Sequence, residues 1–190
     1  MFMHAFTDAT WRKGLNWWIK ERLYNSGDSR ILFDKIYRAV NEDHPQLLNN
    51  LQPMETWEDQ AGFPVITVSR SGSILTISQE RFMYDRSLQS DSVWKFPLNY
   101  VVGSNPDYSI TKLDFWMINR NMTLHSNSAP KPWGENDWLL FNIKATGYYR
   151  INYDKVLWEL LIDQLNAENE GFKLIHYRNR AQLIDDAYNL

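Results

Sequence analysis

Cysteine is absent from the 190 residues of this chain. Its absence excludes disulfide bonds, a thiolate nucleophile and thiolate metal ligands. The absence of cysteine does not determine the cellular compartment, because a well-packed domain outside the cell needs no disulfide crosslink. Apolar runs long enough to span a bilayer are also missing, and the first residues, MFMHAFTDATW, lack the basic segment and long apolar stretch of a signal peptide.

An excess of positive charge is lacking too, because the formal net charge is −3. Binding along a nucleic-acid backbone needs clustered cations that neutralise phosphates, so we expect no nucleic-acid partner. The sequence contains no G-x-S-x-G nucleophile turn, no phosphate-binding G-x-x-x-x-G-K loop and no dinucleotide-binding glycine pattern. We therefore nominate no catalytic and no cofactor-binding residue in this chain.

Histidine is scarce, and its spacing does not fit a metal site. Two histidines that share a zinc ion on one helix lie four residues apart, and no two histidines here have that spacing. We interpret each as a surface or structural residue and expect no metal ligand in this chain. The histidines are His4, His44, His125 and His176.

Two pairs of adjacent carboxylates, Glu42–Asp43 and Asp185–Asp186, invite an acid–base interpretation. Neighbouring helical residues point about 100° apart, so we expect neither pair to converge on one atom. We interpret both pairs as helix caps and solvated helix faces.

Aromatic residues, by contrast, are abundant, with nine Trp, ten Tyr and nine Phe. Large rings also occur on surfaces that bind carbohydrate or peptide, but they bury much apolar area and belong mainly to cores. We therefore expect a well-filled core.

The first third of the chain has the apolar spacing of helices. Thr7 or Asp8 can cap a helix over residues 7–24. Tryptophans mixed with cations could suit a membrane interface, but we interpret this helix's apolar stripe as a core face covered by neighbouring helices. The stripe consists of Trp11, Leu15, Trp18, Ile19 and Leu23.

Two further helices are expected before residue 62. Ser29 can cap the second helix, and Pro45 disfavours its continuation. Pro53 can start a short third helix within residues 51–60.

The pattern changes at Gly62, where short β-branched and aromatic runs separated by turn residues begin. This spacing predicts an antiparallel β-sandwich. Pro97 within one run indicates an edge strand or a bulge. Gly62 lies at the corner between helix and strand, where a positive φ or a close approach requires glycine.

Helical spacing returns after Asp154, which can cap the next helix, and Asn179 can cap a last one. The predicted fold class is α+β, with helices in residues 1–61, a β-sandwich in residues 62–153 and helices in residues 154–190. Because the chain starts and stops within helical patterns rather than in polar tails, we expect it to be a piece of a larger protein.

The stretch TGYYRINYD, residues 146–154, concentrates three tyrosines and an arginine in front of the predicted helix. Strand alternation puts Tyr148 and Arg150 on one face and Tyr149 and Ile151 on the other. Tyrosines bury their rings and keep their hydroxyls at polar seams. Rings on both faces, followed by a capped helix, indicate a rigid junction between domains.

Four stretches together resemble one family, the aminopeptidase N-type zinc metallopeptidases. Residues 138–154 (WLLFNIKATGYYRINYD) resemble its junction segment, and residues 57–68 (WEDQAGFPVITV) resemble its entry into a small β-sandwich domain. Residues 179–190 (NRAQLIDDAYNL) are similar to the first helix pattern of its C-terminal helical domain. Residues 6–36 resemble the closing helices of its catalytic domain. The matches follow the family's order over nearly the whole chain.

The resemblance implies a parent enzyme that removes N-terminal amino acids from peptides. In this family two histidines of H-E-x-x-H and a downstream glutamate hold zinc, and the motif's glutamate activates water. Those positions lie upstream of residue 1, so the resemblance implies no catalytic residue and no zinc ligand here. It implies an interdomain scaffold that packs against catalytic and helical domains outside this chain. Ile151 stands where the family usually has valine, a conservative change.

Localisation follows the resemblance and one motif. Asn121-Met122-Thr123 is an N-glycosylation sequon, which makes Asn121 a glycosylation candidate. Together with the likeness to cell-surface forms, it favours the extracellular face of the plasma membrane, with a cytoplasmic location as the alternative. A stand-alone β-sandwich module that binds protein or glycan, or a catalytically inactive relative, remains an alternative to the scaffold of an active peptidase.

Overall fold

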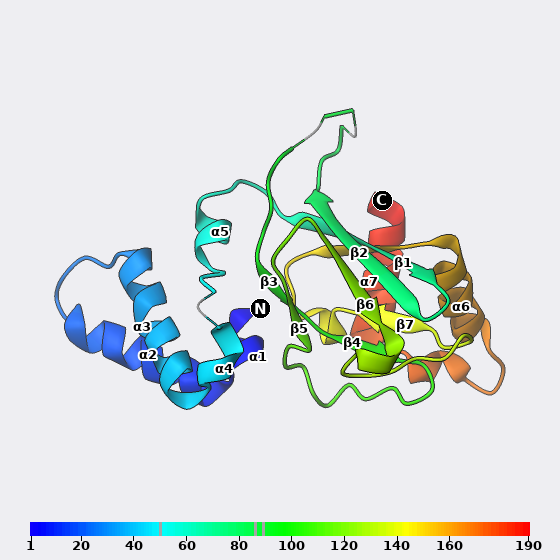
Figure 1. Ribbon diagram of the computed structural model, residues 1–190, viewed down its shortest axis with the longest axis horizontal. Coiled ribbons are helices and arrows are strands. Elements are labelled where there is room, and N and C mark those ends of the chain that lie inside the picture. The colour runs from blue at the N-terminus through cyan, green and yellow to red at the C-terminus, as the bar shows by residue number, and fades with distance from the viewer. Residues whose placement is uncertain (50, 86, 89) are drawn as a thin grey trace.

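The computed structural model describes residues 1–49, 51–85, 87–88 and 90–190. Figure 1 shows helices of the first third of the chain on one side, and the strands with the last two α-helices on the other. The N-terminal helices are α1 (Phe2–Phe6), α2 (Asp8–Glu21), α3 (Ser29–Asp43), α4 (Pro45–Leu48) and α5 (Glu55–Glu58). In the described ranges, none of the helices combines the length and the apolar character that crossing a membrane requires.

Helices α2 and α3 pack side by side, and their first residues show how local polar groups set helix ends. The side chain of Thr7 accepts a hydrogen bond from the Thr10 amide at 3.2 Å, which confirms the predicted cap. Asp28, rather than the predicted Ser29, caps α3 by accepting from the Arg30 amide at 2.8 Å. A carboxylate one residue earlier thus takes the role expected of the hydroxyl.

The apolar stripe of α2 is less buried than a core face. Thr10 and Gly14 are the buried residues of this helix, whereas Ile19 is 52% exposed and Leu23, two residues beyond the helix end, is 57% exposed. A β-carbon on Gly14 would lie 2.7 Å from the Ile36 Cα atom, so the glycine permits close packing on α3. The expected core face is therefore only partly covered: Trp11, Leu15 and Trp18 are partly buried, whereas the end of the stripe at Ile19 and Leu23 is exposed.

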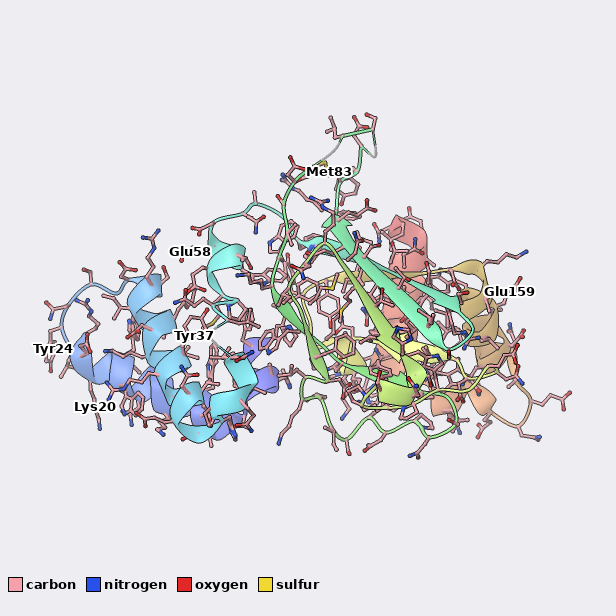
Figure 2. All side chains as sticks on the ribbon, viewed as in Figure 1. Lys20, Tyr24, Tyr37, Glu58, Met83 and Glu159 are labelled. Atoms are coloured by element: carbon pink, nitrogen blue, oxygen red, sulfur yellow. The ribbon has the colours of Figure 1, made fainter. Side chains whose placement is uncertain are left out.

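A small core lies where α1, α3, α4 and the start of α5 meet. Its buried members are Ala5, Phe6, Ile36, Tyr37, Val40, Leu48 and Met54. The Tyr37 hydroxyl donates to Glu55 at 2.6 Å and accepts from the Met54 amide at 2.8 Å, which fixes the entry to α5. Figure 2 shows Tyr24 at the far end of the helical region, pointing away from the strands, and this ring is 98% exposed.

The strand-rich part begins after Gly62, whose φ of +94° is the positive value predicted for this corner. Four strands form one sheet in the order β6-β2-β1-β8: β1 (Pro64–Ser71), β2 (Ile74–Arg81), β6 (Asn121–His125) and β8 (Arg150–Tyr153). Two short pairs complete the strands, β3 (Phe96–Leu98) with β5 (Phe115–Met117) and β4 (Tyr100–Val102) with β7 (Leu139–Phe141).

The α+β fold class is confirmed, with one correction to strand direction. Strands β1 and β8 run parallel, pairing Val65 with Arg150 and Val68 with Tyr153, whereas the other pairs are antiparallel. Parallel neighbours need a long crossover connection. Here the other strands supply it, because the chain travels through them before β8 returns to the free edge of β1.

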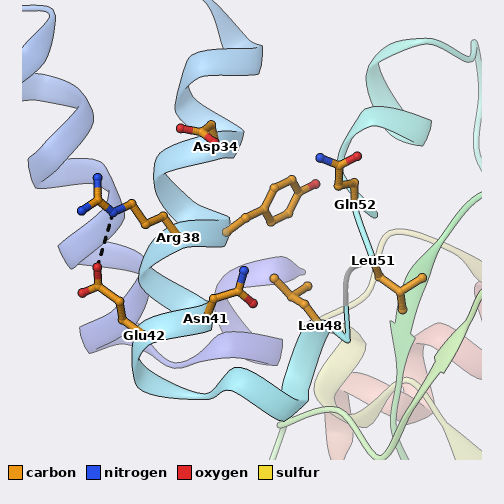
Figure 3. Close-up of a pocket in the computed structure, with 8 residues that line it drawn as sticks. Asp34, Arg38, Asn41, Glu42, Leu48, Leu51 and Gln52 are labelled. Atoms are coloured by element: carbon orange, nitrogen blue, oxygen red, sulfur yellow. Dashed lines mark hydrogen bonds and ion pairs between the residues drawn. The ribbon is translucent and has the colours of Figure 1, made fainter.

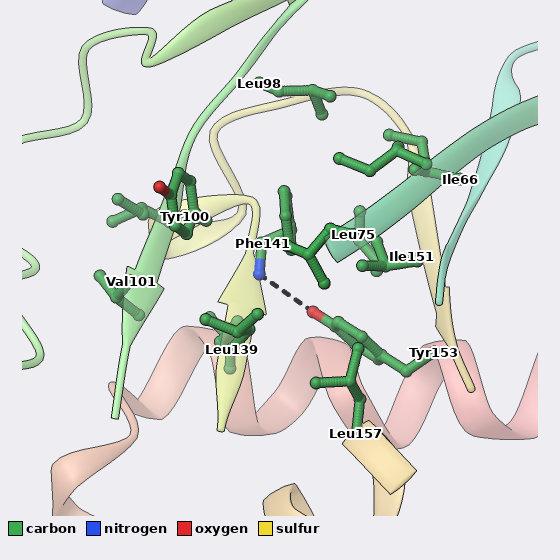
Figure 4. Close-up of a cluster of buried hydrophobic side chains, with 14 of the residues drawn as sticks. Ile66, Leu75, Leu98, Tyr100, Val101, Leu139, Phe141, Ile151, Tyr153 and Leu157 are labelled. Atoms are coloured by element: carbon green, nitrogen blue, oxygen red, sulfur yellow. Dashed lines mark hydrogen bonds between the residues drawn. The ribbon is translucent and has the colours of Figure 1, made fainter. Parts of the chain in front are cut away.

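A large core fills the space between these strands and the C-terminal helices (Figure 4). Helix α6 (Lys155–Asn166) contributes Leu157 and Leu161, and α7 (Tyr177–Asn189) contributes Leu183. The buried Tyr153 hydroxyl accepts a hydrogen bond from the Phe141 amide at 3.0 Å. Burial raises the pKa of Tyr153, so this phenol stays neutral and serves as a structural acceptor.

Helix capping at the C-terminal end gave one confirmation and one error. Asp154 caps α6 by accepting from the Leu157 amide at 2.8 Å, and its other oxygen accepts from the Arg70 amide at 2.5 Å. Asn179 does not cap α7, because the helix starts at Tyr177 and the His176 ring accepts from the Arg178 amide. Three 3-10 turns lie between these helices and strands. Turn η1 (Ser126–Ser128) follows β6, η2 (Ile143–Ala145) lies between β7 and β8, and η3 (Gly171–Leu174) lies between α6 and α7.

Candidate functional site: the junction of strand β8 and helix α7

The histidines lie on separate elements and make local contacts. The His4 ring is 3.0 Å from the Thr111 hydroxyl oxygen, and burial lowers the pKa of this imidazole. His44 joins α3 to α4, and His125 ends β6. Burial and then the nearby Lys144, Arg178 and Arg180 lower the pKa of His176, which suits its role as a neutral cap. Across the described ranges, no group of three or more His, Cys, Asp or Glu residues could hold a metal ion.

The expectation that neither carboxylate pair converges on one atom was wrong for both pairs, whereas Glu42, Asp43 and Asp185 are exposed, as the solvated interpretation predicted. Asp185 and Asp186 contact the same nitrogen, Nη1 of Arg150, at 2.5 and 2.9 Å. Glu42 and Asp43 likewise both contact Nζ of Lys13, at 3.1 and 2.6 Å. Adjacent side chains do leave a helix in different directions, but a long cationic side chain from a facing element reaches between them.

Asp186 is a buried connection between α7 and β8. Its residue surface is 2% exposed, and its second oxygen accepts from the Ile151 amide at 3.1 Å. Burial raises the pKa of Asp186, while the amide and Arg150 act in the opposite direction. Burial also opposes the charge on Arg150, but hydrogen bonds to Asp185 and Asp186 raise the pKa of the guanidinium. One arginine thus joins the strand to both carboxylates of the helix.

Asn179 makes a second connection at this junction. Its amide nitrogen donates to the Asn142 carbonyl at 2.8 Å, and its oxygen accepts from the Lys144 amide at 2.8 Å. Asn142, Lys144 and Ala145 all have left-handed φ, at 63°, 55° and 54°. Such backbone persists where surrounding contacts over-determine it, and Asn179 supplies two of these contacts from α7.

The two adjacent tyrosines separate as the alternation predicts. Tyr149 is 6% exposed and its hydroxyl donates to the Pro97 carbonyl at 3.3 Å, whereas Tyr148 is 63% exposed. The Tyr148 ring centre lies 5.3 Å from that of Phe63 and 6.2 Å from that of Trp57. Arg150 and Ile151 continue the same alternation, since Ile151 is buried and Arg150 partly exposed. One face of the segment joins the core and the other meets the surface.

A cavity of about 350 Å³ lies between this segment and α7. Its walls combine aromatic rings, the backbone of the left-handed turn and the carboxylates of α7. The lining residues are Phe63, Asn142, Ala145, Gly147, Tyr148, Tyr149, Arg150, Gln182, Asp185 and Asp186.

A second, larger hollow of about 620 Å³ lies beside α3 and α4 in the helical region (Figure 3). Arg38 and Glu42, at one side of it, pair with each other at 3.4 Å, and Tyr37 is bonded to Glu55. The groups best able to act on a ligand are therefore already engaged. The lining residues are Asp34, Tyr37, Arg38, Asn41, Glu42, Leu48, Leu51 and Gln52.

The glycosylation candidate is on the surface. Asn121 is the first residue of β6 and is exposed, as is Thr123 of the sequon. These two residues pair in register with Ser78 and Thr76 of β2.

Sequence reasoning found the segment that builds the junction but missed its partners on α7. The sequence placed Tyr148, Tyr149 and Arg150 at a seam, yet Asn179 was interpreted as a cap and Asp186 as a solvated residue. The one available signal was the polar pair Asn179 and Asp186, seven residues apart and therefore on the same helix face. The apolar Leu183 lies between them on that face.

Comparison with known proteins gives matches along the whole chain. Residues 138–190 match the ERAP1-like C-terminal domain family. An aminopeptidase N from Plutella xylostella aligns with the whole chain at 35% identity, and the alignment covers 20% of that protein. Human aminopeptidase N aligns with the whole chain at 32% identity, and the alignment covers 19% of that protein. The chain is also 32% identical to 18% of the human thyrotropin-releasing hormone-degrading ectoenzyme.

The chain thus spans about a fifth of the length of the curated relatives it matches. The family-model match includes the junction segment and all of α7, and the relatives align over both the helical and the strand-rich parts. The resemblance of the four sequence stretches is confirmed, and the chain belongs to the aminopeptidase N-type family as a segment of that longer architecture.

Proposed function

We propose that this chain is the interdomain scaffold of a zinc-dependent aminopeptidase that removes N-terminal amino acids from peptides. The observation that supports the proposal is similarity along the whole chain to a segment of aminopeptidases, combined with two polar connections from α7, one to β8 and one to the turn at Asn142. Two buried polar links across one seam fix an angle between a strand and a helix more rigidly than apolar contact alone. Fixing that angle is what a scaffold between larger bodies requires.

The proposed domain boundaries follow the sequence expectation. Residues 1–61 would close the catalytic domain, residues 62–153 would form the β-sandwich domain and residues 154–190 would begin the helical domain. The separate small core of the N-terminal helices supports the first boundary. The second boundary is less sharp physically, because α6 and α7 share the large core with the strands.

Zinc belongs to the proposed parent enzyme and not to this segment. The donor set needed for it does not come together in the part of the chain that the structure describes. The histidines lie on separate elements, and the grouped carboxylates are neutralised by Lys13 or Arg150. These residues do not fit a zinc site, so no catalytic step is assigned to them.

The test uses the purified chain itself. We expect no zinc in elemental analysis after dialysis and no hydrolysis of an aminoacyl chromogenic substrate, with full-length human aminopeptidase N as the positive control. One tightly held zinc ion per chain, or cleavage that survives repurification, would overturn the scaffold assignment. A second measurement replaces the matching segment of human aminopeptidase N with this chain. Activity of that chimera, lost when Arg150→Met is added, would support the role in domain placement.

We also propose that the scaffold lies on the extracellular face of a plasma membrane and that Asn121 carries a glycan. The exposure of Asn121 and Thr123 supports accessibility of the sequon, and one relative is named an ectoenzyme. Secretion of the chain from animal cells should give a band that glycosidase treatment shifts. Asn121→Gln should remove that shift, whereas Asn127→Gln, which alters an exposed asparagine outside a sequon, should leave it.

A stand-alone module that binds protein or glycan is the second candidate. The aromatic cavity and the exposed rings of Tyr148, Tyr177 and Tyr188 favour it. A highly stable monomer that binds a glycan or protein without a peptidase partner would support this candidate, whereas activity of the chimera would favour the scaffold.

A further inference from the structure

We infer that His176 makes the start of α7 sensitive to acid: the neutral ring caps the helix, and the protonated ring releases that cap. The inference concerns the chain itself and does not depend on the peptidase activity proposed above. Three features of the structure support it: the hydrogen bond that the ring accepts, the charges that surround the ring, and the connection between the first turn of α7 and the turn η2.

The ring of His176 is the side-chain acceptor at the start of α7. Its Nδ1 atom accepts a hydrogen bond from the Arg178 amide at 3.3 Å, and this amide is one of the donors that have no partner inside a helix. An imidazole nitrogen accepts a hydrogen bond only while it carries no proton. Protonation of Nδ1 therefore breaks this bond and leaves a cation at the positive end of the helix dipole.

The cations around the ring disfavour its protonation. Burial is the largest cause that lowers the pKa of His176, followed by the charges of Lys144 in η2 and of Arg178 and Arg180 in α7. The Arg180 guanidinium carbon lies 4.8 Å from the centre of the Phe172 ring in η3, and this contact holds the cation near the start of the helix. A proton on the imidazole would therefore add a positive charge to a positive region.

Two aromatic rings lie against the imidazole. The ring centre of Tyr108, in the segment between β4 and β5, is 5.5 Å from that of His176, and the Tyr177 ring stacks at 4.4 Å. Burial raises the pKa of Tyr108 to about 12, so this phenol is neutral while the imidazole titrates. Ring faces attract cations, but burial and the neighbouring cations outweigh that attraction, because the pKa of His176 is lowered.

Carboxylates of the adjoining segments have partners of their own. Asp107, between β4 and β5, accepts from the Ser109 amide at 2.7 Å. Glu170, which precedes η3, pairs with Lys173. Within the described ranges, every cause that acts on the imidazole lowers its pKa, so no carboxylate there compensates for the cations.

The capped turn also contains the connection from α7 to η2. Asn179 lies three residues after His176, donates to the Asn142 carbonyl and accepts from the Lys144 amide, both at 2.8 Å. Fraying of the first turn withdraws Asn179 from backbone with left-handed φ, which depends on surrounding contacts. Acid therefore acts on the helix cap and, through Asn179, on the seam between α7 and the turn that leads into β8.

The pH at which the cap weakens differs from that of the surface carboxylates. Because the folded-state pKa of His176 is lower than the unfolded value of about 6.5, the stabilisation is present above that value and is lost as pH falls through the lowered one. The loss begins above the ordinary carboxyl range. Asp186 on the same helix has a raised pKa and acts in the opposite sense, so the experiment has to separate the two groups.

The experiment measures hydrogen-exchange protection of the isotope-labelled chain at about pH 7.5 and about pH 5, with each amide corrected for its intrinsic rate. We expect protection of the Arg178 and Lys144 amides to fall about fivefold at the lower pH, the size of a lost helix cap. One amide bonds to His176 and the other to Asn179. The Arg178 amide resonance should move with the same midpoint as the His176 ring. Unchanged protection, or two separate midpoints, would overturn the inference.

Matched variants assign the response to one ring. His176→Asn keeps a good side-chain acceptor at the cap position but cannot titrate, so its protection should be equal at the two pH values. His125→Asn removes an exposed histidine at the end of β6 and should show the same fall as the unchanged chain. A fall that persists in His176→Asn would belong to Asp186 or another group, and a fall that disappears in His125→Asn would belong to His125. Either result would overturn the inference.

Discussion

The helical region before residue 62 and the strand-rich region after it are each stabilised by a different kind of interaction. The helical region has a small core and, between α2 and α3, ion pairs at the surface, such as Lys13 with Asp43 and Lys35 with Glu21. The strand-rich region has a large core with buried polar links such as Arg150–Asp186. Surface ion pairs contribute little in water, whereas removing one partner of a buried pair is costly.

This difference teaches where the molecule should open first. Regions with few buried contacts and exposed hydrogen bonds open locally at low free energy. The hairpin of α2 and α3 should therefore loosen before the sheet. The two regions nevertheless contact each other at several places. The Trp116 indole donates to the Leu47 carbonyl at 2.8 Å and its ring packs on Phe6, and the Trp57 indole donates to the Lys95 carbonyl at 2.9 Å.

The largest expected effect comes from the buried pair. Asp186→Ala should lower the free energy of unfolding of the strand-rich region by about 3–5 kcal/mol, because it leaves Arg150 and the Ile151 amide without this partner. Chemical denaturation followed by circular dichroism measures the loss. The control is Asp185→Ala, whose carboxylate is exposed and should cost at most about 1 kcal/mol. Equal effects of the two variants would contradict the distinction between buried and surface charge.

A smaller effect should appear when the two helices are forced apart. Gly14→Ala adds a β-carbon 2.7 Å from the Ile36 Cα atom, and overpacking of this kind costs about 1–3 kcal/mol. The alanine's better helix propensity returns about 1 kcal/mol, so the net change should still be destabilising. Hydrogen exchange should rise in α2 and α3 but not in β1 or β2.

The helical region offers a matched control for that variant. Asn16→Ala changes an exposed position of the same helix and should be neutral or slightly stabilising. Faster exchange in β1 or β2 of Gly14→Ala would show that the two regions unfold as one unit.

Asp154→Ala tests the start of the C-terminal helices. The variant removes the cap of α6 and the acceptor of the Arg70 amide, and loss of such a cap costs about 1–2 kcal/mol. The midpoint of thermal unfolding measures it, and Asp163→Ala on the same helix serves as the control. An unchanged midpoint in Asp154→Ala would show that the Asp154 cap does not stabilise the start of α6.

The smallest effect is a difference in response to acid. Hydrogen bonds from Lys13 and then Thr10 lower the pKa of Asp43, and a hydrogen bond from Lys35 lowers that of Glu21. Because these folded-state pKa values lie below the unfolded ones, their stabilisation exists above the ordinary carboxyl range and is lost as pH falls through the lowered values. The hairpin should therefore weaken as pH falls below about 4.

Asp186 should respond in the opposite sense. Its folded-state pKa is raised by burial, so the part of the stability that is linked to its protonation is fully present below the ordinary value and is lost as pH rises through the raised one. Resonance intensities of α2 and β8 between neutral and acidic pH separate the two responses. Asp43→Asn should flatten the acid response of the hairpin, and a hairpin response that persists in this variant would contradict the assignment.

Prediction from sequence succeeded where the cause is local. The cap at Thr7, the cap at Asp154 and the positive φ of Gly62 each depend on residues within one turn or corner. The alternation of Tyr148 and Tyr149 depends only on strand period. The fold class followed from the same short-range patterns, summed along the chain.

Prediction failed where the cause is distant in sequence. The sequence allowed Asn179 to cap its own helix, but its side-chain amide instead bonds to the left-handed turn. It donates to the Asn142 carbonyl and accepts from the Lys144 amide. Asp185 and Asp186 diverge on their helix, but Arg150, some 35 residues earlier in the chain, draws them to one nitrogen. The cavity lining joins Phe63, residues 142–150 and α7, and no local pattern indicates that meeting.

By itself the sequence determined the kinds of elements, their order, the position of the junction segment and the family. Those properties follow from side-chain periodicity, capping chemistry and motif, all read within a few turns. Tertiary structure alone decided that β8 pairs parallel with β1, that Asp186 is buried against Arg150, and that a net-negative aromatic cavity opens beside α7. The reason is that burial and charge pairing depend on which distant segments the core brings together.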